Sequence, residues 1–146
     1  MGQLQRPRDV CLTEGHDIVV ADTGNHRIQI FHNDGSISVL GAGPGSEPGL
    51  LTKPSGVAVC QDGRLVVADS GNHRIQIFNG DGSVNKVFGS SGSQEGFFKE
   101  PRAVAINSRG EILVSDTNNH RIQIFDDQAR LKHCFGRLGD GHGEFR

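Results

Sequence analysis

The sequence predicts an all-β fold built from three copies of one unit. A ten-residue stretch that starts at Asp22 returns at Asp69 and again at Asp116, 47 residues apart each time. Its last seven residues, Asn-His-Arg-Ile-Gln-Ile-Phe, are identical in the three copies. A fixed period of 20 to 50 residues is the signature of a repeat architecture. The 21 glycines among the 146 residues add frequent tight turns, which suit short strands joined by hairpins.

The second copy shows the order of strands and turns within one unit. Two short apolar runs, 57–60 and 65–68, flank Asp62-Gly63, a dipeptide that strongly favours a hairpin turn. Residues 74–78 alternate with a period of two, as a strand should, and residues 83–88 form the fourth strand after another Gly-rich turn. Four short antiparallel strands in 47 residues predict a propeller blade. Propeller repeats of the kelch and WD types fit less well, because the chain contains no Trp.

Three such blades account for the chain, with approximate bounds 4–50, 51–97 and 98–146. The first copy departs from the other two in two places. Residues 37–41 are shifted by one position in the fourth strand, and Gly15 stands one place away from the glycine of the other first hairpins. Local bulges or a one-residue loop change would absorb both differences.

Composition and charge restrict the classes of function. The formal charge of −2 gives no global positive field for nucleic acid or an anionic membrane. No run reaches the roughly 18 apolar residues of a membrane span, and the first residues lack the apolar core of a secretory signal. Cys11, Cys60 and Cys134 show neither zinc spacing nor a disulfide framework. We therefore expect a reducing, cytoplasmic setting without membrane association.

Each copy resembles an NHL repeat, a name taken from the triplet that stands here as Asn25-His26-Arg27. The resemblance runs from a Pro-x-x-Val start to the repeated Phe and covers essentially the whole chain. Segments 6–10 and 21–27 further resemble the NHL regions of tripartite-motif (TRIM-NHL) proteins. The resemblance implies a closed six-bladed propeller, of which this chain would supply half, and a loop face that binds partners.

The polar residues of the repeated motif invite a catalytic interpretation, or a ring of histidines around a metal ion. A residue that recurs in every blade is more simply explained by a structural need that every blade shares. The aspartates can accept hydrogen bonds from the backbone of the following turn, and the asparagines suit unusual turn angles. The histidines and arginines can bond across the turn or to the next blade. We therefore expect a structural role, and neither a metal site nor a cofactor, for Asp22, Asn25, His26, Arg27, Asp69, Asn72, His73, Arg74, Asp116, Asn119, His120 and Arg121.

Positions that differ between the copies are free to carry recognition. They gather around the three repeated prolines, in the loops that the family resemblance assigns to the binding face. The cationic residues among them could form a basic patch and Phe97 could offer a stacking surface, whereas Phe98 is expected to be a structural plug. A solvated polar rim is the alternative. The predicted binding residues are Arg6, Arg8, Lys53, Ser55, Phe97, Lys99, Arg102 and Asn118.

The leading functional interpretation is a non-catalytic module that recognises a partner protein or peptide through these loops. RNA stem-loop binding is the first alternative, and it is weakened by the near-neutral charge, the absence of Tyr and Trp, and Glu100 inside the patch. An enzyme is the third class: some NHL-like propellers resemble a peptide-amidating lyase with an active-site tyrosine, which this sequence lacks. An engineered or duplicated propeller without a ligand is the fourth.

Three blades leave two apolar sheet faces without a neighbour. Exposed faces of this kind favour association or aggregation. We expect a homodimer in which two chains close six blades around a twofold axis. The alternative is that the sequence is part of a longer propeller protein.

Overall fold

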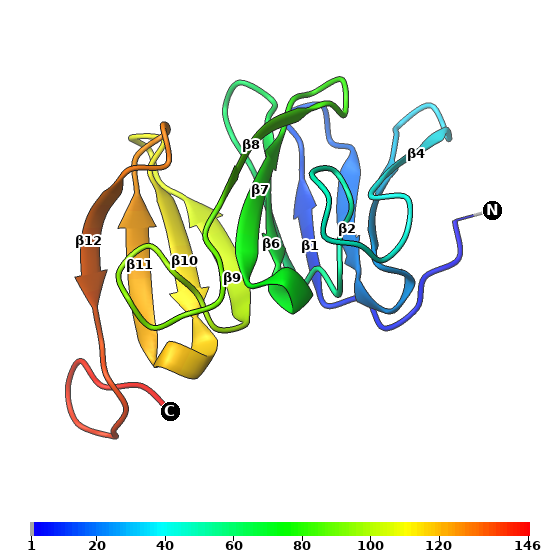
Figure 1. Cartoon of the computed structure of the whole chain (residues 1–146). Coiled ribbons are helices and arrows are strands. Elements are labelled where there is room, and N and C mark those ends of the chain that lie inside the picture. The colour runs from blue at the N-terminus through cyan, green and yellow to red at the C-terminus, as the bar shows by residue number, and fades with distance from the viewer. Residues whose placement is uncertain (1) are drawn as a thin grey trace.

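The structure is a computed structural model, and it describes residues 2–146. Three four-stranded antiparallel sheets lie side by side, from the first blade in blue to the third in yellow and orange (Figure 1). The strands are β1 (Asp9–Leu12), β2 (Ile18–Asp22), β3 (Arg27–Phe31), β4 (Ile37–Leu40), β5 (Gly56–Val59), β6 (Leu65–Asp69), β7 (Arg74–Phe78), β8 (Val84–Phe88), β9 (Pro101–Ile106), β10 (Ile112–Asp116), β11 (Arg121–Phe125) and β12 (Leu131–Phe135). The predicted all-β fold of three four-stranded blades is confirmed. None of the helical segments in the described residues has the length and hydropathy to cross a membrane.

Each blade is a meander in which consecutive strands pair. In the second blade, β6 pairs with β7 from Leu65–Phe78 to Asp69–Arg74. The equivalent strands of the first and third blades pair in the same register. This register places the aspartate of the repeated motif directly opposite its arginine, at the end of the central hairpin.

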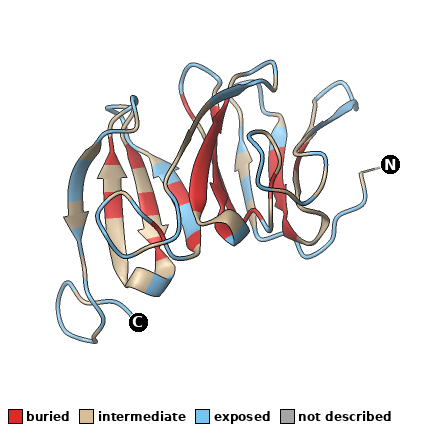
Figure 2. Cartoon of the chain, in the orientation of Figure 1, coloured by how far each residue is buried: buried red, intermediate tan, exposed pale blue. Residues whose placement is uncertain are grey.

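The apolar core lies between the sheets. The middle sheet is buried on both faces (Figure 2), because successive side chains of β6 point to opposite neighbours. Val67 belongs to the cluster shared with the first blade, and Val66 belongs to the cluster shared with the third. Leu51 and Phe98 stand one repeat apart in the two crossings between blades, and each is fully buried in one of these junctions.

The first blade departs from the other two in its outer hairpins. β4 pairs with β3 without a register shift, whereas β8 and β12 contain a shift beside Phe78 and Phe125. A bulge therefore absorbs the one-residue difference in the fourth strand, as expected, and it lies in the second and third copies. In the first hairpin, His16 takes the left-handed conformation (φ 66°) that Gly63 and Gly110 take in the other blades. The hairpin keeps its length as a result.

A 3-10 turn follows the second strand of each blade, at the lower end of the blades in Figure 1. The turns are η1 (Thr23–Asn25), η2 (Ser70–Asn72) and η3 (Thr117–Asn119). The residue after each turn is the left-handed one: His26, His73 and His120 have φ values of 56°, 54° and 53°. The expectation that the asparagines take the unusual angles is wrong. The asparagines end the turns, where their amides reach the carboxylate that closes the preceding strand.

Candidate binding face

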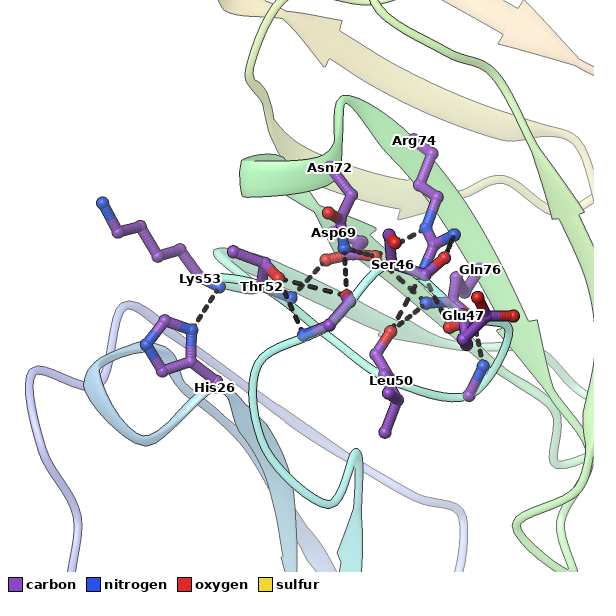
Figure 3. A network of polar contacts seen from close by, with 12 residues as sticks. His26, Ser46, Glu47, Leu50, Thr52, Lys53, Asp69, Asn72, Arg74 and Gln76 are labelled. Carbon is purple, nitrogen blue, oxygen red and sulfur yellow. Dashed lines mark hydrogen bonds and ion pairs between the residues drawn. The ribbon is translucent and has the colours of Figure 1, made fainter.

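One buried aspartate in each blade accepts hydrogen bonds from the other polar side chains of the repeated motif. In the second blade, Asp69 Oδ2 accepts from Asn72 Nδ2 at 2.9 Å, Arg74 Nε at 2.7 Å and Gln76 Nε2 at 3.0 Å (Figure 3). Its Oδ1 accepts from the backbone N–H of Thr52 at 2.7 Å. Both oxygens of this fully buried carboxylate are therefore satisfied, as a charge in the interior requires.

The same arrangement recurs around Asp22 and Asp116. The backbone donors are Gln5 and Lys99, which lie 17 residues upstream of the two aspartates. The expectation that the turn after the strand supplies this donor is therefore wrong. Burial by itself raises the pKa of Asp22, but the bonds from Gln5 and from three motif side chains outweigh it and hold the pKa below its usual value.

The motif arginines donate hydrogen bonds to backbone carbonyls of the crossings between blades. Arg74 donates from Nη1 to the carbonyl of Ser46 at 2.6 Å, and from Nη2 to the carbonyls of Glu47 and Leu50 at 3.1 and 3.0 Å (Figure 3). Arg121 makes the equivalent three bonds to the second crossing. An arginine suits this position because its five donors are held in a fixed plane.

The motif histidines join each blade to the next. His26 Nδ1 accepts from the backbone N–H of Lys53 at 3.1 Å, and His73 Nδ1 accepts from that of Glu100 at 3.0 Å. Lys53 and Glu100 precede the repeated prolines and both have a left-handed φ of 50°. Non-glycine residues rarely hold this conformation unless the surroundings impose it. Figure 3 shows the result at Lys53, whose side chain extends away from the aspartate network.

A pocket of about 330 Å³ lies where these loops meet. We name it the cationic cup; its lining residues are Arg8, Thr23, Thr52, Lys53, Ser70, Gly71, His73, Glu100 and Arg102. All three blades contribute: Arg8 precedes β1, Lys53 precedes β5, and Arg102 lies in β9. The fold thereby brings together three cations that are 45 or more residues apart in the chain.

The cup has an excess of positive charge. Arg102 Nη2 lies 3.4 Å from Glu100 Oε2, and both side chains are about half exposed. Within the described part of the chain, Arg8 and Lys53 have no carboxylate partner at ion-pair distance. The arrangement therefore suits an anionic group, which the two unpaired cations can bind.

The other predicted binding residues lie outside the cup. Ser55 is buried, and its hydroxyl bonds Ser70 and the carbonyl of Arg102, so it supports the cup from below. Arg6 is exposed beyond the lining. The carbonyl of Lys99 accepts from the backbone N–H of Asn118 at 3.0 Å, which places this pair at the third blade. Phe97 is 38% exposed and lies against Gly92 in the second crossing.

Sequence reasoning did not select six of the lining residues as part of a binding site: Thr23, Thr52, Ser70, Gly71, His73 and Glu100. His73 belongs to the invariant motif, so the argument from repetition assigned it to the scaffold. Thr23 and Ser70 occupy equivalent positions of the repeat and were given no role. Glu100 carried a usable signal, because it replaces a cation of the other two copies. Thr52 stands where the other copies have Gln and Lys, and this variation could have drawn attention to it.

Comparisons with known proteins agree with this architecture. A solved virginiamycin B lyase from Staphylococcus aureus superposes with a TM-score of 0.71 at 16% identity, over 92% of this chain and 42% of the lyase. A gluconolactonase from Xanthomonas campestris superposes with a TM-score of 0.66 at 19% identity, over 88% of this chain and 46% of that protein. At such identities the likeness shows the fold alone. The chain spans less than half the length of either structure.

The sequence comparisons identify the repeat itself. Protein brain tumor from Drosophila melanogaster is 53% identical over 34 residues, which are 23% of this chain and 3% of that protein. The family model described as NHL repeat matches residues 4–31, 51–78 and 98–125, one stretch in each blade. The chain belongs to the NHL-repeat family and resembles the NHL region of TRIM-NHL proteins.

Proposed function

We propose that this chain is a non-catalytic binding module, in which the cationic cup receives a carboxylate of a partner protein or peptide. The observation that carries the proposal is the meeting of Arg8, Lys53 and Arg102 from three blades in one pocket. Guanidinium groups bind carboxylates through two parallel hydrogen bonds, which gives both affinity and orientation. The backbone N–H of Lys53 bonds His26, which fixes this residue of the cup before a partner arrives.

The surroundings of the cup favour a peptide over RNA. Recognition of single-stranded RNA bases uses aromatic side chains as stacking surfaces. The lining contains no aromatic ring other than His73, whose Nδ1 is engaged by Glu100, and Phe97 lies outside it. The chain also lacks the excess of positive charge that drives binding to phosphate backbones. A single carboxylate needs neither feature.

The polar groups nearest to a catalytic arrangement are used by the scaffold. His73 Nδ1 accepts the backbone N–H of Glu100, and the Ser70 hydroxyl bonds the carbonyl of Pro101. A serine nucleophile needs a histidine that is free to accept its proton. The enzymes among the structural neighbours share the fold at low identity, so the likeness gives no argument for the same chemistry in this chain. These contacts support a binding role.

The three cysteines support a reducing, cytoplasmic setting as part of the proposal. Cys11, Cys60 and Cys134 are free thiols, one in each blade. An oxidising compartment would expose such thiols to pairing between chains. A binding module that keeps three of them fits a reducing compartment.

Selection from a displayed library of random peptides tests the proposed function. We expect the wild-type chain to enrich peptides with Asp or Glu, and the enrichment to be lost in the double variant Arg8→Ala/Arg102→Ala. The matched control is Arg109→Ala/Lys132→Ala, which removes two exposed cations elsewhere on the third blade. Glu100→Gln should strengthen binding, because it removes the anion beside Arg102.

Two outcomes would contradict the proposal. Equal loss in the cup variant and the control would show that only the net charge matters. Filter binding of a structured RNA at low and high salt is the second check. Salt-sensitive RNA binding that disappears in Arg8→Ala/Arg102→Ala, without acidic peptide enrichment, would assign the cup to phosphate.

A further inference from the structure

Within the described residues, the first blade presents an apolar sheet face that has no neighbouring sheet. Val10 is 60% exposed, whereas its equivalent Val57 is 3% exposed in the junction between the first two blades. Ile18 is 44% exposed, whereas its equivalent Leu65 is 3% exposed. A groove on this face is lined by Leu4, Pro7, Arg8, Asp9, Val10 and Val20. The face has the composition of an internal junction but is open.

The third blade presents the complementary open face. Ala105 is exposed, although its equivalent Ala58 is buried against the third blade. Phe145 is 37% exposed, although its equivalent Phe98 is fully buried in the second junction. The two ends of the chain therefore display the two halves of one type of junction.

Polar links complete each internal junction. The first link is the bond from a pre-proline N–H to the histidine of the preceding blade, as between Lys53 and His26. The second is a bond from a hydroxyl in the 3-10 turn to a proline carbonyl: Thr23 Oγ1 donates to the Pro54 carbonyl at 2.6 Å. Ser70 makes the same contact with Pro101 in the second junction.

Within residues 2–146, the third blade carries the accepting histidine and the donating hydroxyl of these links without their partners. His120 Nδ1 is buried, and within residues 2–146 it has no hydrogen-bond partner. A buried polar atom without a partner costs stability, so such atoms are rare in folded proteins. Thr117 stands where Thr23 and Ser70 stand in the other blades. By analogy with the internal junctions, His120 Nδ1 would accept from a pre-proline N–H, and the Thr117 hydroxyl would donate to a proline carbonyl.

The first blade carries the matching donor in a conformation that is already set. Arg6 precedes Pro7 and has a left-handed φ of 49°, against 50° at both Lys53 and Glu100. The backbone at Arg6 therefore has the geometry that points the equivalent N–H groups at a histidine.

We propose that the open face of the third blade binds the first blade of a second copy of this chain. The N–H of Arg6 donates to His120 Nδ1 of the partner copy, and the Thr117 hydroxyl donates to the carbonyl of Pro7. Val10 and Ile18 then cover the sheet that displays Ala105. The junction reproduces the two internal ones in both its apolar and its polar contacts.

Two copies close the assembly. Two copies of these three blades make six, which lies within the four to eight blades that propellers contain. Head-to-tail contacts that close into a ring of two obey a twofold axis. Each dimer contains two identical new junctions.

Closure requires one short segment to move at each new junction. Leu51 and Phe98 each fill one buried position, or slot, in an internal junction. Leu4 and Phe145 are three repeat lengths apart, so in the closed ring both would occupy the equivalent slot of the new junction. The segment around Leu4 is held by its own blade, since the Gln3 carbonyl accepts from Arg27 and Gln29. Residues 144–146 bond only to their own exposed loop. Phe145 therefore withdraws, and Leu4 of the second copy takes the slot.

Light scattering on five samples tests the proposal. We expect twice the chain mass for the wild type at micromolar concentration. Val10→Asp and Ala105→Asp should each be monomeric, with dissociation constants raised about a hundredfold or more, because a carboxylate would lose its water in the junction. An equimolar mixture of the two variants should recover a dimer, since one junction in the mixed pair has two intact faces. Gln61→Asp, in an exposed turn of the middle blade, is the control that stays dimeric.

Each contrary result is decisive. A monomeric wild type overturns the proposal. Dissociation by Val10→Asp alone, with Ala105→Asp still dimeric, would show that like faces pair and would also overturn it. Both substituted positions are exposed in the single chain, so circular dichroism should report an intact β fold in each variant.

Discussion

Asp69 and Arg74 form an ion pair of 2.7 Å inside the middle blade, where the Asp69 side chain is fully buried and that of Arg74 is 10% exposed. Asp69→Asn would leave the guanidinium without its counter-charge. Removing one partner of a buried ion pair destabilises a protein by about 3–5 kcal/mol. We therefore expect a fall of that size in the free energy of unfolding, measured by urea titration.

The first blade provides the matched comparison. Arg27, the equivalent partner of Asp22, is 29% exposed and keeps access to water. Asp22→Asn should therefore cost less than Asp69→Asn in the same titration. Equal losses would show that burial of the arginine does not decide the cost.

The lowered pKa of Asp22 predicts a dependence of stability on pH. Burial raises this pKa, but hydrogen bonds from Gln5, Asn25, Arg27 and Gln29 to the carboxylate outweigh it. A carboxyl group whose pKa is lower in the folded state stabilises the fold above its ordinary value of 3.8, and this stabilisation is lost as the pH falls through the lowered value. The urea midpoints of the wild type and Asp22→Asn should therefore converge as the pH is taken below 3.8. A constant difference would contradict the assignment.

The fold could be predicted from the sequence because every local signal repeats. The strand of residues 74–78, the hairpin at Asp62-Gly63 and the plug position of Phe98 each recur at the same spacing. The strand and turn assignments that are ambiguous in one copy are supported by the same pattern in the other two. The sheet order and the four strands of each blade follow from it.

The candidate site could be predicted only in part, because the decisive contacts join distant residues. The left-handed backbone of Lys53 depends on His26, which lies 27 residues earlier in another blade. No local preference of Lys before Pro indicates that conformation. The variable cations were found because they differ between copies. His73 was missed because a repeated residue can serve the scaffold and also line a pocket.

Ala129 is a further site where one copy departs from the backbone that the others use. It has a left-handed φ of 61°, and its equivalents are Gly35 and Gly82. A residue with a Cβ is strained there by about 1–2 kcal/mol, part of which the entropy of glycine offsets. Ala129→Gly should raise the free energy of unfolding by about 0.5–1 kcal/mol. The reverse change, Gly110→Ala, should lower it, since Gly110 has a φ of 74° and open space around it; opposite signs would contradict the argument.

The thiol of Cys11 should react slowly with alkylating reagents. Burial, with a smaller contribution from the Asp9 carboxylate, raises its pKa to about 11. Since only the thiolate is nucleophilic, about one molecule in a thousand would be reactive at pH 8. Mass spectrometry after iodoacetamide treatment should find Cys11 largely unlabelled in the folded chain and rapidly labelled in urea. Equal rates in both conditions would show that the environment of β1 does not protect the thiol.

The competition between Leu4 and Phe145 predicts that a substitution can tighten the proposed dimer. The ring of Phe145 lies against Gly136 in the slot that the second copy must enter. Phe145→Ala should therefore lower the dissociation constant of the dimer by about threefold or more, because less apolar surface has to be displaced. Leu4→Ala should have the opposite effect, since it removes the side chain that enters. Sedimentation velocity on both variants, with Gln61→Ala as a control, measures the two shifts. If Phe145→Ala weakens the dimer and Leu4→Ala leaves it unchanged, Phe145 keeps the slot and the segment around Leu4 is the one that moves.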